Sequence, residues 1–187
     1  MDFIIKKKQI KTKLISSLIK SFASITLKGN LIHTIGNLPE KNSKAPDFSL
    51  TSKTLEDKSL SDFKDKKVVL NIFPSLDTEV CAASVRKFNK EAGNLKDTVV
   101  LCVSRDLPFA QNRFCVAEGL NNVITLSEMK DSNFSEKYGV KITDGPLKGL
   151  MSRSVVILDK NHNIIYTQQV PEITQEPNYK NALDALK

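Results

Sequence analysis

Tryptophan is absent from this chain, and aromatic residues make up only 6% of its 187 positions. Aliphatic side chains must therefore supply most of the core, and an apolar content of 40% is enough for one compact domain. No apolar run approaches the roughly 20 residues that a membrane-spanning helix needs. We therefore expect no stable insertion into a membrane.

Histidine and cysteine are also scarce, with two and three residues. No two cysteines lie within four positions of each other, so no pair has the spacing of a zinc site. An odd number of cysteines in a chain of this length does not indicate a disulfide scaffold of a small secreted protein. A phosphate-binding glycine loop is missing as well. We expect neither a metal nor an organic cofactor, and redox chemistry is the better explanation of the cysteines.

The net charge of +7 is concentrated at one end of the chain. Residues 1–30 hold seven lysines and one acid, Asp2, whereas the remaining residues carry 21 basic and 20 acidic side chains. A solvated lysine-rich extension explains this distribution, and binding to nucleic acid or anionic lipid is the alternative. We expect no nucleic-acid partner for the nearly neutral body.

We interpret residues 1–22 as a basic extension and residues 23–187 as one domain. Apolar side chains between Leu14 and Phe22 recur at helical spacing, which favours a flexible or weakly helical segment. A signal peptide is the rival interpretation, although its apolar core would be short and interrupted by two serines. We expect a cytoplasmic location, with the periplasm as the alternative if residues 1–22 act as a signal.

Strand and helix patterns alternate through the rest of the chain. Apolar residues alternate on both sides of Gly29, which predicts a β-hairpin. The patterns further predict strands at 47–51, 67–73, 98–103, 123–126, 154–158 and 164–168, and helices at 78–93, 108–119, 132–138 and from about 176 onward. A βαβ unit followed by a second hairpin and a helix resembles a thioredoxin-like α/β sandwich, with a central mixed sheet flanked by helices.

The most informative stretch surrounds Cys81. A continuous apolar strand stops at Pro74, a short loop follows, and a helix begins near Thr78, a good N-cap residue. Cys81 then lies in the first turn, where the helix dipole favours a thiolate. Thr78 and Cys81 share one helix face, so the hydroxyl can touch the sulfur.

Reduction of a peroxide needs this combination of groups. The thiolate attacks one peroxide oxygen, and the other leaves as an oxyanion. Attack needs a desolvated nucleophile, and departure needs positive charge and hydrogen-bond donors. A proline in the loop can shield the sulfur from water, and an arginine from elsewhere in the chain would complete the site.

The pattern Pro74-x-x-x-Thr78-x-x-Cys81 resembles the signature of the peroxiredoxins. Its flanks, residues 71–75 and 82–89, are similar to those of the bacterial thiol peroxidases, which are atypical 2-Cys peroxiredoxins. Further similar stretches lie at residues 107–111, 113–115, 118–123 and 144–150, and together they extend the resemblance over roughly residues 24–187.

This resemblance implies that Cys81 is the peroxidatic cysteine and that Cys115, in the same chain, is the resolving cysteine that forms a redox-active disulfide with it. It also implies that Pro74, Thr78 and Arg153 complete the peroxide pocket. Hydrogen peroxide and organic hydroperoxides are the implied substrates, and thioredoxin is the implied reductant. The resemblance further implies a homodimer.

The two cysteines of this pair belong to different predicted helices, separated by the strand that contains Cys102. A disulfide needs Cα atoms within about 7 Å, whereas a peroxide pocket needs Cys81 fixed and unobstructed. We therefore expect Cys81 and Cys115 to be too far apart to bond in the reduced protein. Cys102 itself lies inside a buried strand and is interpreted as an inert thiol.

Some interpretations stay open. Glu79 departs from the small residue that many members of this family carry, and together with Asp77 it would oppose ionisation of the thiol. Arg86 either pairs with one of these acids or supports the pocket.

Two other functions compete with peroxide reduction. The C-x-x-S form of residues 81–84 fits a thiol–disulfide oxidoreductase, but Arg153 stands where such reductases usually carry proline. A redox sensor or a scaffold held by the basic extension is the second alternative.

Overall fold

The computed structural model describes residues 22–187. The interpretation of residues 1–22 as a separate extension therefore falls almost wholly outside the described residues, and that division of the chain stays a prediction. Within residues 22–187, no helix has both the length and the apolar character needed to cross a bilayer.

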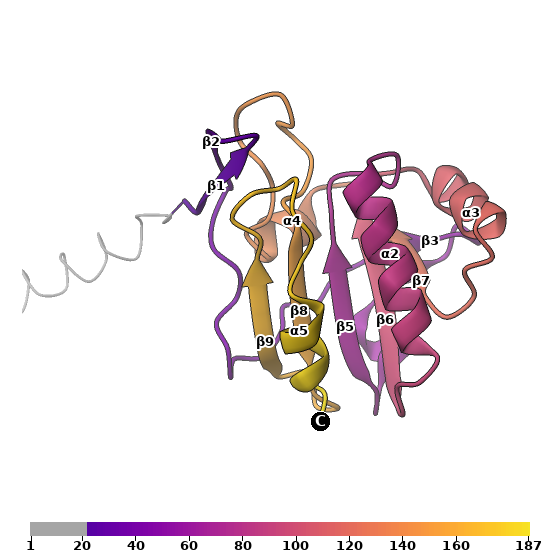
Figure 1. Ribbon diagram of the computed structural model, residues 1–187. Coiled ribbons are helices and arrows are strands. Elements are labelled where there is room, and N and C mark those ends of the chain that lie inside the picture. The colour runs from indigo at the N-terminus through magenta and orange to yellow at the C-terminus, as the bar shows by residue number, and fades with distance from the viewer. Residues whose placement is uncertain (1–21) are drawn as a thin grey trace, which may run out of the picture.

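A mixed seven-stranded sheet forms the centre of the fold (Figure 1), in the order β4-β3-β7-β6-β5-β8-β9. Strands β5, β6 and β7 run parallel to one another, and the outer pairs are antiparallel. This architecture confirms the predicted thioredoxin-like α/β sandwich. The strands are β3 (Leu50–Ser52), β4 (Asp57–Lys58), β5 (Lys67–Ile72), β6 (Thr98–Ser104), β7 (Ile124–Ser127), β8 (Ser154–Leu158) and β9 (Ile164–Gln169).

Helices cover both faces of this sheet. They are α2 (Glu79–Ala92), α3 (Pro108–Ala117), α4 (Asn133–Lys137) and α5 (Tyr179–Asp184), together with the 3-10 helix η1 (Leu60–Phe63). Alternate residues of β5 enter different cores, because successive side chains of a strand point to opposite faces. Leu70 packs in the same cluster as Phe134 of α4, whereas Val69 packs in the cluster that contains Phe88 of α2 and Ala182 of α5.

Three details differ from the sequence prediction. The strand predicted at residues 47–51 is β3 (Leu50–Ser52) and begins three residues later, because the Asp47 side chain accepts hydrogen bonds from two main-chain N–H groups there. Helix α5 begins later than residue 176, because Pro177 is buried and Asn178 caps the helix by accepting a hydrogen bond from the Asn181 N–H. Strand β4 and η1 were not predicted, since two and four residues are too few to show a periodic pattern.

The predicted N-terminal hairpin is confirmed. Strand β1 (Ser24–Leu27) pairs antiparallel with β2 (Asn30–His33), and the two turn residues Lys28 and Gly29 have φ angles of 51° and 78°. Positive φ at both central positions is the requirement of a type I′ turn, which glycine meets at no steric cost. The hairpin lies at the end of the sheet where α2 begins (Figure 1).

Candidate functional site

Cys81 lies in the first turn of α2 and is fully buried. Strand β5 delivers the chain to a loop that begins with the buried Pro74 and ends at Thr78, the N-cap of the helix. The spacing of proline, threonine and cysteine thus places all three at one end of α2, as the sequence predicts.

The Thr78 hydroxyl contacts the sulfur directly. Its Oγ1 lies 2.7 Å from Cys81 Sγ and 3.0 Å from the carbonyl oxygen of Ser75. The expectation that this side chain accepts a capping hydrogen bond from a helix N–H is wrong, because the hydroxyl turns toward the sulfur instead. The hydroxyl has one proton, so it can donate to a thiolate, or accept from a thiol while it donates to Ser75. The same side chain can therefore serve both protonation states of Cys81.

Arg153 approaches the sulfur from the position directly before β8. It is 3% exposed, and its Nη2 lies 3.5 Å from Cys81 Sγ. Nε and Nη2 both donate to the carbonyl oxygen of Ile173, at 3.1 and 3.0 Å. Nη1 has no hydrogen-bond partner in residues 22–187. Because a buried donor without a partner is costly, Nη1 is suited to receive an oxygen of an incoming ligand.

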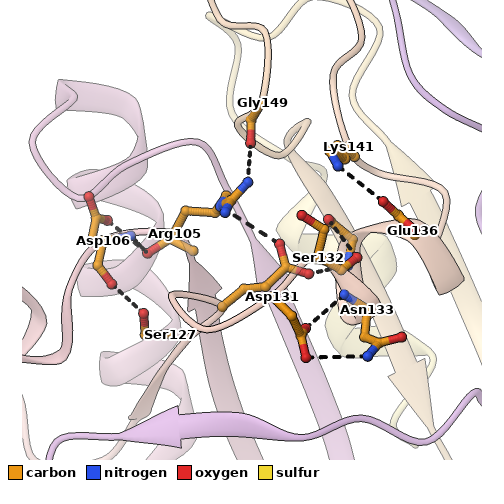
Figure 2. A network of polar contacts seen from close by, with 12 residues as sticks. Arg105, Asp106, Ser127, Asp131, Ser132, Asn133, Glu136, Lys141 and Gly149 are labelled. Atoms are coloured by element: carbon orange, nitrogen blue, oxygen red, sulfur yellow. Dashed lines mark hydrogen bonds and ion pairs between the residues drawn. The ribbon is translucent and has the colours of Figure 1, made fainter.

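Asp106 holds the loop that precedes α2, and sequence reasoning missed it. Its Oδ1 accepts from Ser75 Oγ at 2.6 Å, and its Oδ2 accepts from the Leu76 N–H at 2.8 Å and from Ser104 Oγ at 2.7 Å. Its main-chain oxygen accepts from Ser127 Oγ at 2.6 Å (Figure 2). One carboxylate thus ties the Cys81 loop to the turn between β6 and α3. The only sequence signal was its place after a buried strand, at the edge where parallel strands end.

Substituting Asp106 with asparagine should lower the free energy of unfolding by about 2 kcal/mol, because hydrogen bonds to a charged acceptor contribute more than neutral ones. An amide cannot accept from all three donors that the carboxylate engages. Urea denaturation measures the change, with the exposed Asp77→Asn as the matched control. Equal stability of the two variants would show that the clamp contributes nothing.

Arg105 braces the segment that leads to Arg153. Its Nη1 donates to the carbonyl oxygen of Gly149 at 3.1 Å (Figure 2), and its Nε lies 4.0 Å from Oε2 of the buried Glu128. Burial raises the pKa of Glu128, while the Ser135 N–H and Arg105 oppose that rise. Arg105 and Asp106, the two residues that follow β6, therefore support the segment before β8 and the Cys81 loop, respectively.

The other two cysteines occupy different surroundings. Cys102 is fully buried in β6, and desolvation raises its pKa to about 12. Cys115 is half-buried in α3 and lines a groove of about 300 Å³ with Lys53 and Thr125. Burial raises the pKa of Cys115, and a hydrogen bond with Thr125 and the charge of Lys53 oppose this. All three cysteines are free thiols.

Cys115 does not lie beside Cys81. The Cys81 sulfur contacts Arg153 at the start of β8, whereas Cys115 lines a groove with Thr125 of β7. Strands β8 and β7 are separated by β5 and β6, which amounts to about 14 Å at the usual strand spacing. The arrangement agrees with the expectation that the reduced thiols are too far apart to form a disulfide.

Arg86 takes neither of the two expected roles, because its partner is a third acid. Its Nε and Nη2 donate to the carboxylate of Glu118 at 2.9 and 2.8 Å, so it links α2 to the end of α3. Asp77 and Glu79 are exposed. In the described part of the chain, no cluster of three or more His, Cys, Asp or Glu side chains is placed to hold a metal ion.

Comparisons with known proteins agree with this geometry. The family model described as Redoxin matches residues 40–183. A thiol peroxidase of Mycobacterium tuberculosis is 54% identical over 164 residues, which covers 88% of this chain and 98% of that protein.

Solved structures show the same similarity. A peroxiredoxin-like protein from Aquifex aeolicus superimposes with a TM-score of 0.83 at 38% identity, covering 88% of this chain and 96% of that one. A thiol peroxidase from Chromobacterium violaceum has a TM-score of 0.82 at 20% identity, covers 90% of this chain and 97% of that one, and shares the fold.

Proposed function

The chain belongs to the Redoxin family and is a thiol-dependent peroxidase, and from this premise we propose that Cys81 is its peroxidatic residue and Cys115 its resolving residue. One observation carries the proposal. The buried Cys81 sulfur lies in a helix first turn with the Thr78 hydroxyl at 2.7 Å and the Arg153 guanidinium at 3.5 Å. Both groups are donors, and they surround the atom that must attack.

In the proposed first step, the Cys81 thiolate attacks one peroxide oxygen and the O–O bond breaks. Sulfur is oxidised to sulfenic acid, and the second oxygen leaves with the electron pair and takes up a proton to give water or an alcohol. Arg153 is suited to hold this oxygen because its Nη1 has no hydrogen-bond partner among the described residues. The proposal also gives the buried Pro74 the role of limiting access of water to the sulfur.

In the proposed second step, the Cys115 thiol attacks the sulfenic sulfur, a disulfide forms and water leaves. The spacing of β7 and β8 requires the first turn of α2 or the helix α3 to rearrange first. A thioredoxin-type dithiol then reduces the disulfide by exchange and is itself oxidised. The surroundings of Cys102, buried on all sides in β6, argue against its use in either step.

The experiment that tests the proposal is a coupled assay of NADPH consumption with thioredoxin reductase, thioredoxin and either hydrogen peroxide or an organic hydroperoxide. We expect peroxide-dependent turnover. Insulin reduction by the protein with dithiothreitol, in the absence of thioredoxin, thioredoxin reductase and peroxide, measures the competing oxidoreductase activity. The proposal requires it not to exceed the rate with dithiothreitol alone.

Two further features belong to the proposal. We propose a homodimer, supported by Leu107 and Phe109 at the start of α3, which are 54% and 63% exposed. Analytical ultracentrifugation at micromolar concentration tests it.

We also propose the cytoplasm as the location, because thioredoxin-type reductants keep thiols reduced there.

A further inference from the structure

We propose that the N-terminal hairpin positions the guanidinium of Arg153, acting through the Glu172 side chain and the carbonyl group of Ile173. Glu172 is then a positioning residue for peroxide reduction, although it does not touch the reacting sulfur. The inference rests on the proposed role of Arg153 at the leaving oxygen.

The Glu172 carboxylate accepts hydrogen bonds from the hairpin and from its own loop. Oε2 accepts from the Gly29 N–H at 3.0 Å and from Thr26 Oγ1 at 2.8 Å, and Oε1 accepts from the Lys28 N–H at 3.1 Å. Thr174 adds two donors to Oε1. These hydrogen bonds, led by that of Gly29, hold the pKa of Glu172 far below its usual range. The side chain is therefore a carboxylate at neutral pH.

The main chain next to Glu172 pairs with β1. The Thr26 N–H donates to the Pro171 carbonyl at 2.7 Å, and the Ile173 N–H donates to the Thr26 carbonyl at 2.9 Å. The Ile173 side chain is 3% exposed and packs with Ile25 and Ile32 of the hairpin. Ile173 is thus held by the hairpin through both its N–H and its side chain. The segment after β9, to which Ile173 belongs, lies beside the hairpin (Figure 1).

The remaining polar group of Ile173 faces the site. Its carbonyl oxygen accepts from Nε and Nη2 of Arg153, and the Val170 N–H donates to the Arg153 carbonyl at 2.9 Å. The second proton of Nη2 is left for the Cys81 sulfur at 3.5 Å, and Nη1 has no partner within the part of the chain that the structure describes. The position of one carbonyl oxygen thus fixes the plane of the guanidinium, and a displacement of about 1 Å in a reacting group can cost up to 100-fold in rate.

Electrostatics alone predicts the opposite effect of removing Glu172. The carboxylate does not pair with Arg153, and deleting a negative charge near the site would favour the thiolate. A slower reaction of an uncharged variant therefore reports lost positioning and not lost charge.

The test uses the full chain and measures the second-order rate constant of the reduced enzyme with hydrogen peroxide in single turnover. We expect Glu172→Ala to lower this rate constant about 10-fold, which is less than the roughly 100-fold that a misplacement of about 1 Å can cost. Thr26→Val, which removes one donor to Glu172 at nearly constant volume, should shift it in the same direction by less. Glu40→Ala, which removes an exposed carboxylate elsewhere, should leave it unchanged.

The decisive comparison repeats Glu172→Ala in the background of Arg153→Ala. If Glu172 acts through Arg153, the second substitution causes no further loss, because the group being positioned is already absent. A loss by the same factor in both backgrounds would overturn the inference and indicate a general structural role. So would a wild-type rate of Glu172→Ala.

The outcomes separate this inference from the proposed function. A wild-type rate of Arg153→Ala would contradict the proposed function itself. A slow Arg153→Ala with a fast Glu172→Ala would contradict only the positioning role. If Glu172→Ala does not fold, Glu172→Gln and Thr26→Val decide, and wild-type rates of both would reject the inference.

Discussion

Replacing Cys81 with serine is expected to abolish peroxide-dependent NADPH consumption in the thioredoxin-coupled assay. A serine hydroxyl is not ionised near neutral pH and cannot form the sulfenic acid that the disulfide step consumes. Loss of a nucleophile usually costs several orders of magnitude, so we expect a decrease of at least about 10³-fold. The protein should stay folded, because serine is close to cysteine in size.

Cys102→Ser is the matched control for this experiment. Cys102 is as deeply buried as Cys81, but it lies inside β6 and its pKa is raised to about 12, so it stays a neutral thiol at working pH. We expect nearly wild-type turnover. Substantial activity of Cys81→Ser, or equal losses in both variants, would refute the assignment of the nucleophile.

Arg153→Ala should have the second-largest effect, on the rate of sulfenic acid formation. Loss of one preorganised donor to a developing oxyanion costs on the order of 3 kcal/mol, which corresponds to roughly 150-fold in rate. The arginine is 3% exposed, so its interactions with an oxygen are not weakened by solvent. Stopped-flow competition with a second peroxidase measures this step without the recycling enzymes.

Arg153→Lys should recover only part of that loss. The planar fork of arginine donates to the Ile173 carbonyl and faces the sulfur, while Nη1 is left without a partner in residues 22–187. An ammonium group is a point charge and cannot reproduce this geometry. Small and equal effects of both substitutions would place Arg153 outside the chemical step.

The central part of the fold could be predicted from local patterns. The apolar run of β5, followed by Pro74 and Thr78, sets the strand end, the loop and the helix start that bury Cys81. These features are local in sequence, and each has a single simple physical cause. Arg153 is assigned to the site only through the resemblance to the bacterial thiol peroxidases, and its place directly before the apolar run of β8 is compatible with that assignment.

The supporting groups could not be predicted in this way. Glu172 and Gly29 are 143 residues apart, and Asp106 and Ser75 are 31 residues apart. No periodicity reports such pairs, because the partner of a polar side chain is decided by the tertiary structure. The same reason explains why Arg86 bonds to Glu118 and why the Thr78 hydroxyl leaves the helix cap for the sulfur.

The most direct test of the account maps the oxidised cysteines by peptide mass spectrometry after treatment with equimolar hydrogen peroxide. In Cys115→Ser, trapped with dimedone, we predict an adduct on Cys81 and none on Cys102. In the wild-type protein, digested without reduction, we predict a disulfide between the peptides of Cys81 and Cys115. A dimedone adduct on Cys102, or a wild-type disulfide that includes Cys102, would contradict the account.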